Sequence, residues 1–546
     1  MKNILFVFLL VSSILFAQQN DKKWDKVIAY ENEGKIKSAN EIVLKIYNKA
    51  ISDQDEAEII KCFFYQSKYL QVIDENAQTK ILNNLKIDIN RVSIPSKAIL
   101  NLVYAKCMND YYARNEYQIK KRTNIATLNE DFLTWTEKNF TDQIKSSLQQ
   151  TLESESILKS TSLTKYESIF DYSTLEKFKT QNLYEYLLKE NITLHSQKVR
   201  QWEIKKKEFD SYKKQLLGKS SDFLALNLDF VTNENLRSLL NLYQKQEKSN
   251  PNIDNQLERL LYCKTNLVDS IEDYTRALIT LQKSTNDETS IQKIQLIRAI
   301  LLSQQASKAI HPDYNTKATV VLDSILNKNN NTNAYQSAIQ QKQFITSKSI
   351  TAELKKNSYS DENTRAFIQY KNVDHLKVSF YKITQNRINE FRNSPLDKDS
   401  LVNVIIEKQK AIKSSDYQLI NKKDFFQYST EVLLPQLKTG NYLVYFESDS
   451  DSKETKAFAY ETITISNIGL LASQKDKTES FQVLDRKTGK PLENVSIKLL
   501  NQTIKTDKNG FASHDKENNN YNYEPLLLTT ENDTILIVKN YIRYNH

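Results

Sequence analysis

Glycine, histidine and cysteine are scarce in this sequence, and each shortage excludes a class of chemistry. The 546 residues include 6 glycines, and no G-x-G-x-x-G, phosphate-loop or G-x-S-x-G motif is present. Because such motifs use glycine to bring backbone amides close to a phosphate or an oxyanion, neither nucleotide binding nor nucleophile-elbow chemistry is indicated. The 5 histidines are too far apart to share a helix face, and no H-E-x-x-H motif occurs; they are His195, His311, His375, His514 and His546. We therefore expect no catalytic residue, no metal site and no cofactor.

Charge of one sign is not concentrated anywhere along the chain. The 76 basic and 67 acidic residues are interspersed, so the net charge of +9 forms no basic arm or stripe. Nucleic-acid binding needs such a stripe, together with aromatic side chains on which bases stack, and no nucleic-acid partner is expected. Apolar residues still make up 39% of the chain, enough to build cores for three or four domains of ~150 residues.

The one long hydrophobic run lies at the N-terminus. A short basic start, residues 1–3, precedes the apolar residues 4–16, and Ala17 before Gln18 has the form of a cleavage point. The run is shorter than the ~20 apolar residues that span a bilayer, and polar residues follow at once. Residues 1–17 are predicted to be a signal peptide, the alternative being a single anchoring helix. Because no later window is apolar enough to span, we expect no stable transmembrane segment after cleavage.

The three cysteines, Cys62, Cys107 and Cys263, fit neither a disulfide framework nor a zinc cluster. Their number is odd, and their separations are long. Each lies in an apolar helical run, where a thiol behaves as a small buried hydrophobe. We expect buried free thiols, with a disulfide between two of them as the alternative in an oxidising compartment.

The first two thirds of the chain show helical periodicity. Trp24 and Val27 share a helix face, Gly34 can end that helix, and Ala39 and Val43 begin the face of the next. This hairpin resembles one tetratricopeptide unit, but the pattern does not recur at a 34-residue period. Residues 18–360 are predicted to form an irregular all-α array of helical pairs, which can divide into two subdomains. Further helices are expected near residues 95–108, 183–187, 257–281, 291–309 and 318–326.

After about residue 365 the period changes to two, and glycines and prolines become more frequent. Leu376, Val378 and Phe380 alternate with polar residues, as in a strand that has one face in a core. Residues 361–470 are predicted to form one antiparallel β-sandwich, and residues 471–546 a second that need not be complete. The expected fold class is therefore multidomain, α then β.

Two short motifs have a functional and a structural interpretation. Asp449 and Asp451 alternate as in a calcium loop, but the third ligand, the glycine and the closing glutamate are missing, which favours a solvated hairpin tip. The tripeptide His311, Pro312, Asp313 is the signature of the chaperone-activating J domain. It also follows a helical run, and proline after a helix is an ordinary stop, which we favour.

Several groups of residues, in the order in which they occur, carry a resemblance to a known family. In the helical part they are Trp24, Val27, Gly34, Ser38, Ala39, Ile46, Tyr47 and Ala50, then Asp131, Trp135, Phe140 and Ile144, then residues 182–187. In the β part they are residues 370–373, then Leu376, Val378, Phe380, Leu437, Gly440, Tyr442 and Val444, then Val483, Asp485, Thr488, Gly489, Pro491, Thr506, Asp507, Asn509 and Gly510. Together they resemble the N-terminal helical region and first macroglobulin-type sandwiches of large secreted bacterial alpha-2-macroglobulin family proteins.

The resemblance implies a role without catalysis. The chain would be the N-terminal portion of an exported protein that scaffolds a protease-inhibiting trap, with proteases or other envelope proteins as partners. Its location would be the periplasm, the cell envelope or the exterior of a Gram-negative bacterium. Family members that trap proteases carry a Cys-x-Glu-Gln thioester, but Phe63 to Tyr65 follow Cys62 and Lys264 follows Cys263. No thioester residue is therefore assigned, and because the family is longer than this chain we expect a fragment.

Two other interpretations remain open. The chain could be a stand-alone interaction module of the cell envelope, in which a helical array and a sandwich of the carboxypeptidase-regulatory-like type bind a protein partner. The turns at Thr488 to Pro491 and at Thr506 to Gly510 are shared with that type of sandwich. A hydrolase is the third interpretation, and no cluster of acid, base and nucleophile supports it.

Cleavage after Ala17 gives the first testable prediction. If the chain is expressed from its own start codon in a Gram-negative host, the periplasmic protein should begin at Gln18 because the short apolar run serves as a signal and not as an anchor. The intact mass of the purified protein measures this start. A full-length mass recovered from the membrane fraction would instead support the anchoring helix.

Overall fold

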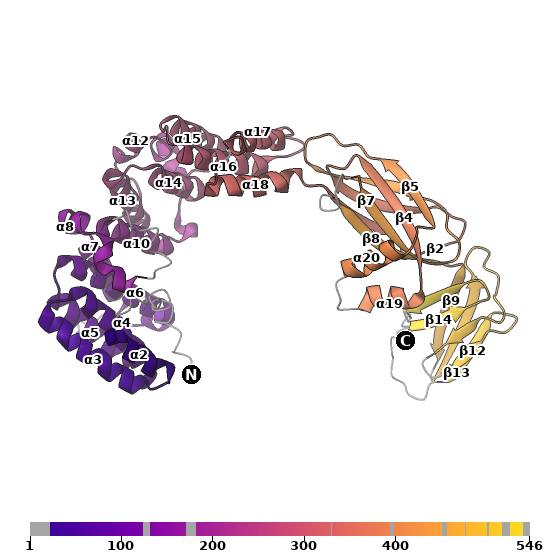
Figure 1. The fold of residues 1–546 in the computed structure, drawn as a ribbon, viewed down its shortest axis with the longest axis horizontal. Helices are drawn as coiled ribbons and strands as arrows, with labels where there is room; N and C mark the ends of the chain where they lie inside the picture. The colour runs from indigo at the N-terminus through magenta and orange to yellow at the C-terminus, as the bar shows by residue number, and fades with distance from the viewer. Residues whose placement is uncertain are drawn as a thin grey trace. The chain divides into compact units, whose positions relative to one another are not determined.

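The structure is a computed structural model that describes residues 22–123, 131–170, 182–328, 330–393, 398–449, 456–475, 477–499, 502–515 and 525–538. The predicted signal peptide lies outside the described residues. The chain divides into two compact units, Met1–Ser284 and Thr285–His546. Helices fill the first unit, whereas the second begins with helices and continues with strands, so the predicted fold class of α then β is confirmed (Figure 1).

The first unit is built from helices joined by short turns. They are α2 (Lys22–Asn32), α3 (Ile36–Asp53), α4 (Glu56–Ile73), α5 (Ala77–Arg91), α6 (Ile94–Ile119), η1 (Phe132–Thr134), α7 (Glu137–Gln150), α8 (Glu155–Ser160), η2 (Leu163–Ile169), α10 (Leu183–Lys198), η3 (Gln201–Glu203), η4 (Lys206–Tyr212), α11 (Lys213–Leu216), α12 (Ser220–Leu224), α13 (Glu234–Ser249), α14 (Ile253–Asn266) and α15 (Ile271–Lys283). In Figure 1 the indigo helices α2 to α5 lie together near the N-terminus.

The predicted N-terminal hairpin is confirmed. Trp24 and Val27 of α2 pack with Ala39 and Val43 of α3 in one cluster, and α4 adds Tyr69 to it. Many of the helices begin with a side chain that accepts a hydrogen bond from the exposed amides of the first turn. The capping residues are Asp55, Asn182, Asn233, Asn252, Ser270, Asp287 and Thr332.

The second unit opens with three helices, α16 (Glu288–Gln305), α17 (Tyr314–Leu326) and α18 (Asn333–Thr346), which share a core. These three helices contact the β part through both apolar packing and hydrogen bonds. Phe425 of the β part packs on the helical core, and the Asn372 side chain donates to the carbonyls of Thr346 (3.0 Å) and Ser347 (3.1 Å) at the end of α18. Because the last carbonyls of a helix lack partners within it, this contact stabilises the helix end.

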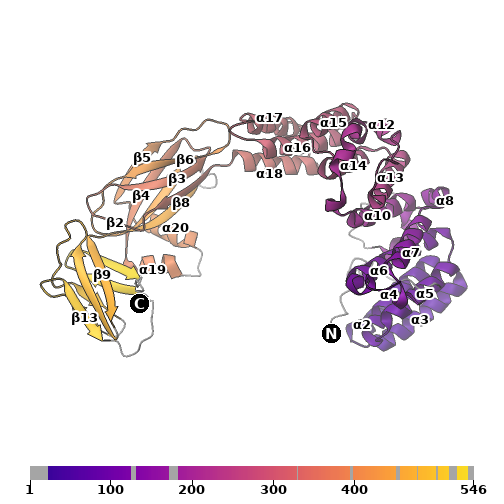
Figure 2. The ribbon, with the colours of Figure 1, turned by 180° about the vertical axis from the view of Figure 1, so that it is seen from behind.

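The first sandwich packs two antiparallel sheets face to face (Figure 2). In the described residues one sheet has the order β1-β3-β6 and the other β2-β8-β7-β4-β5, with β2 parallel to β8. The strands are β1 (Ser349–Leu354), β2 (Asn357–Ser358), β3 (Thr364–Lys371), β4 (His375–Ile383), β5 (Lys413–Gln418), β6 (Gln427–Leu434), β7 (Gly440–Ser448) and β8 (Phe458–Ile465). Inward residues such as Ile368 and Val378 alternate with exposed ones, as the period of two predicts.

Strand β7 departs from this alternation, and the reason is an additional layer. Residues 441–446 are all buried. One face of β7 lies in the sandwich core, and helices α19 (Gln385–Asn393) and α20 (Lys398–Lys408) cover the other, where Phe391 and Ile405 pack on Leu443 and Tyr445. A strand buried on both faces has no polar side to alternate with. Figure 1 shows α19 and α20 beside β7 and β8.

The second sandwich contains the sheets β13-β10-β9 and β12-β11-β14-β15 in the described residues. Its strands are β9 (Ile468–Lys475), β10 (Thr478–Asp485), β11 (Ser496–Lys498), β12 (Thr503–Lys505), β13 (Phe511–Asp515), β14 (Pro525–Thr529) and β15 (Thr534–Val538). Phe481, Val483, Ile497 and Leu528 meet in its core.

The two sandwiches are joined by Ser466 and Asn467, which lie between β8 and β9. The Asp533 carboxylate of the second sandwich accepts from Ser466 Oγ (3.0 Å) and from the Asn467 amide (2.7 Å). On the other side, the Asn467 side chain donates to Ser360 Oγ of the first sandwich (2.8 Å). Both sandwiches therefore bind the same two-residue link.

The segment boundaries differ from those expected from the sequence. Strand β1 begins at Ser349, before the expected boundary at residue 361, and β9 begins at Ile468, before residue 471. Strand β1 is short, and its place in the sheet depends on pairing with the more distant β3, which local periodicity does not report. Within the described residues, no helix is both long enough and apolar enough to cross a membrane.

Two glycines of the second sandwich allow a controlled stability test. Gly510 and Gly489 both have positive φ angles, but a Cβ on Gly510 would lie 2.5 Å from the Val483 carbonyl oxygen, whereas a Cβ on Gly489 meets nothing within 4 Å. G489A should cost about 1–2 kcal/mol for the left-handed conformation. G510A should cost clearly more because strand β10 must move. Hydrogen exchange of β10 in the full chain measures both, and equal exchange in the two variants would contradict the packing at Gly510.

Candidate functional site

The segment between α10 and α13, residues 199–233, is the most irregular part of the first unit and is called the insertion below. It contains only η3, η4 and the short helices α11 and α12. In an irregular segment, many backbone carbonyl and amide groups have no hydrogen-bond partner within the segment. Other parts of the protein must therefore supply these partners. The next two helices, α13 and α14, do so with long side chains.

Arg259 of α14 is the central contact. Its Nη1 donates to the carbonyls of Leu216 (2.6 Å) and Gly218 (3.0 Å) in the insertion. Its Nε donates to Glu247 Oε1 of α13 at 2.7 Å, and neither side chain is exposed. The guanidinium also lies over the Phe223 ring, 4.7 Å from its centre. One buried cation thus connects α13, α14 and the insertion.

Two further side chains of α13 complete this attachment. Gln244 Nε2 donates to the carbonyls of Phe223 (2.8 Å) and Leu226 (2.9 Å). Arg237 Nε donates to the Val231 carbonyl at 3.0 Å. Because these bonds reach successive parts of the insertion, its shape is fixed without regular secondary structure.

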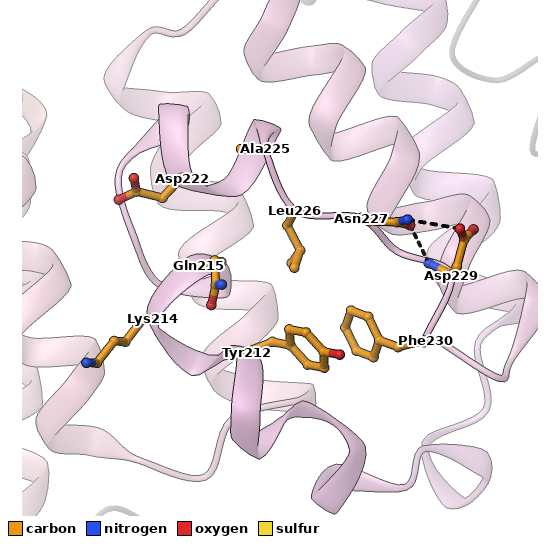
Figure 3. A pocket seen from close by; sticks show the side chains of 9 residues that line it. All are labelled: Tyr212, Lys214, Gln215, Asp222, Ala225, Leu226, Asn227, Asp229 and Phe230. Carbon is orange, nitrogen blue, oxygen red and sulfur yellow. Dashed lines mark hydrogen bonds between the residues drawn. The ribbon is translucent and has the colours of Figure 1, made fainter.

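The insertion lines a first hollow of about 530 Å³, called the aromatic hollow. Tyr212 and Phe230 stack in it with ring centres 3.7 Å apart, and Figure 3 shows Leu226 pointing toward both rings. At its edge the Asn227 side chain donates to Asp229 Oδ2 (3.0 Å). The complete lining is Tyr212, Lys214, Gln215, Asp222, Ala225, Leu226, Asn227, Asp229 and Phe230.

A second hollow of about 520 Å³ lies between the insertion and helices α14 and α15, and is called the cationic hollow. Its apolar lining is Leu217, Leu260, Ala277 and Leu281, and its charged lining is Lys213, Lys214, Lys219, Arg276, Asp222 and Asp273. Lys214 and Asp222 border both hollows, and in Figure 3 both point away from the aromatic rings. The two hollows therefore share part of a wall and differ in the chemistry of their linings.

A third opening, of about 1030 Å³, lies where the turn between α4 and α5 faces α6, and is called the α4–α6 groove. Val72 and Leu133 line it and are 65% and 42% exposed. Exposed apolar side chains along a concave surface are typical of protein-binding sites. The α4–α6 groove therefore offers apolar surface to a partner.

The cysteines are buried free thiols, as predicted. Burial raises the pKa of Cys107 and of Cys263 to about 12, and it also raises the pKa of Cys62 well above its usual value. A thiol reacts as its thiolate, so these three groups remain unreactive at neutral pH. In the part of the chain that the structure describes, no group of three or more His, Cys, Asp or Glu side chains could hold a metal ion.

The other residues singled out in the sequence lie apart from the hollows. Asp449 pairs with Lys348 (3.2 Å), whereas Asp451 lies outside the described residues. His311 exchanges backbone hydrogen bonds with Ser307 in the turn between α16 and α17, which agrees with a helix stop. His195 of α10 is partly buried, and the loss of solvation lowers its pKa.

Sequence reasoning did not find the insertion. Its sequence shows no hydrophobic periodicity, and two of the side chains that bond to it, Gln244 and Arg259, lie 21 and 43 positions from the carbonyls of Phe223 and Leu216. The one available signal was Arg259, a cation between Leu257 and Leu260 on the apolar face of a predicted helix. A charge in that position must find a partner, since its burial alone is costly.

Comparisons with known proteins give a distant likeness. No protein-family model and no curated protein matches the chain. Among solved structures it is similar to a crystal structure of native alpha-2-macroglobulin from Escherichia coli spanning domains NIE-MG1, with 15% identity, a TM-score of 0.26, and coverage of 35% of this chain and 97% of that one. A second structure of that protein, spanning domains MG0-NIE-MG1, has 16% identity, a TM-score of 0.27, and coverage of 36% and 64%.

Removing Arg259 should loosen the insertion. R259M leaves Glu247 buried without its partner and two carbonyls without a donor, so we expect a loss of about 3–5 kcal/mol and faster hydrogen exchange in residues 213–224. Arg276 provides the control, since its ion pair with Asp273 is exposed and R276M should cost less than about 1 kcal/mol. Equal losses in both variants would contradict the role assigned to Arg259.

Proposed function

We propose that the chain is a non-catalytic protein-binding scaffold that works outside the cytoplasm. The observation that carries this proposal is the attachment of the insertion, an irregular segment bonded by the buried Arg259 and by the partly buried Gln244 and Arg237. Loops held by a rigid scaffold are the usual location of binding sites. A buried ion pair often stabilises less than apolar packing of the same volume, so its use here favours a role in defining shape.

The side chains that line the openings support ligand binding more than they support catalysis. In each hollow, polar and charged side chains outnumber the apolar ones, so a ligand would make polar contacts as well as apolar ones. The thiols that could act as nucleophiles are buried and remain protonated. We therefore assign the chain no reaction of its own.

Proteases are the first partner class that we propose, because the resemblance to alpha-2-macroglobulin family proteins implies a role in a protease trap. On this proposal the helical array and the sandwiches are the N-terminal portion of the trap. This chain would position the trap and contact the protease. The chemistry that captures the protease would belong to other segments.

A stand-alone envelope module is the second candidate, and the α4–α6 groove favours it. Val72 and Leu133 expose apolar surface along a concave opening that the chain's own side chains leave open. An amphipathic helix or an extended segment of another envelope protein would bury that surface. The two candidates share the scaffold role and differ in the partner.

Partner capture by the full mature chain tests the proposal. Immobilised wild type should retain a protein from envelope extract, and R259M or V72D, which changes the groove, should reduce its recovery about tenfold or more because a central contact is lost. V320D, at an exposed valine of the second unit, is the matched control for V72D. A protease among the captured proteins supports the trap scaffold, and another envelope protein supports the module.

The same preparation tests the absence of catalysis. Peptide and ester hydrolysis should not exceed that of a heat-denatured sample. Hydrolysis that exceeds it and disappears on denaturation would contradict the proposal, as would capture that all three variants retain equally.

A further inference from the structure

The cationic hollow has an apolar floor and a positively charged rim. Leu217, Leu260 and Leu281 form the floor together with Ala277, and four cationic side chains border it against two anionic ones. Hydroxyl and amide groups of Ser221, Thr280 and Gln256 also reach the lining. A ligand that fits must therefore combine apolar and polar parts.

Two of the four cations are already paired. Lys213 lies 2.9 Å from Asp210, and Arg276 lies 2.9 Å from Asp273 and 3.2 Å from Glu272. Lys214 and Lys219 are exposed, and neither forms an ion pair within the described residues. The remaining charges of the lining are these two ammonium groups and one carboxylate, that of Asp222, whose Oδ2 accepts from the Lys219 amide at 3.3 Å.

The wall that carries these lysines is held rigidly. Arg259 Nη1 donates to the Gly218 carbonyl, and a Cβ on Gly218 would lie 2.4 Å from the Lys214 carbonyl oxygen. The turn from Lys214 to Lys219 is therefore tight and has one shape. Ser220 Oγ, in the same wall, is shielded from solvent and has no hydrogen-bond partner in the described part of the chain.

We propose that the cationic hollow binds an acidic peptide segment, with its carboxylates on Lys214 and Lys219 and an apolar side chain on the floor. This inference rests on the proposed scaffold function and names the chemistry of one of its sites. Charge complementarity selects the acidic ligand, and the hydroxyl and amide groups of the lining suit peptide groups. Nucleic acid fits less well because none of the described lining residues is aromatic, and base stacking needs such a platform.

Calorimetry with the full mature chain tests the inference. The probe is acetyl-Leu-Asp-Glu-Leu-amide, and its neutral counterpart is acetyl-Leu-Asn-Gln-Leu-amide. The acidic peptide should bind at least tenfold more tightly at 50 mM salt, and the difference should shrink at 300 mM salt because exposed charges are screened. K214E/K219E should remove this preference.

The control variant K37E/K45E carries the same change of net charge on α3, at two exposed lysines outside the hollow. It should keep the affinity within twofold, because the effect belongs to the site and not to the overall charge. Equal binding of both peptides, or equal loss in both variants, would overturn the inference. Binding of decanoate without binding of the acidic peptide would also overturn it, in favour of a fatty acid. If the acidic peptide does not bind while partner capture persists, this inference is wrong and the proposed scaffold function is unaffected.

Discussion

The shape of the insertion depends on the buried contact between Arg259 and Glu247. A single guanidinium reaches one carboxylate on α13 and two carbonyls of the insertion, and both charged side chains are shielded from water. Low local dielectric makes such a contact strong when complete and costly when broken. Both hollows have a wall in residues 212–222, so their geometry follows from this contact.

Local sequence patterns predicted the regular elements well. The faces of α2 and α3 could be read from Trp24, Val27, Ala39 and Val43, because a helix repeats its buried positions every three or four residues. The insertion could not be read in this way. Its stability comes from side chains of α13 and α14 that bond to distant backbone groups, and such contacts leave no periodic trace in the sequence.

In the β part, too, local sequence patterns do not report contacts between distant segments. Alternation located β4 correctly, whereas β7 is buried on both faces because α19 and α20 cover its outer face. The boundaries were less accurate than the elements. Strand β1 joins the sheet by pairing with β3, and the end of α18 is held by Asn372, so residues before the expected boundary belong with the strands.

The insertion separates two chemical environments with one short stretch of backbone. The aromatic hollow is lined by Asp222 and Asp229 and by one cation, Lys214, and it contains the stacked Tyr212 and Phe230 rings. The cationic hollow has more positive than negative side chains around an aliphatic floor. An anionic ligand is therefore favoured in one hollow and disfavoured in the other, although the two share Lys214 and Asp222. Discrimination of this kind needs a wall that does not move. The buried bonds of Arg259 supply that rigidity, which is why we connect the least regular segment of the helical unit with recognition.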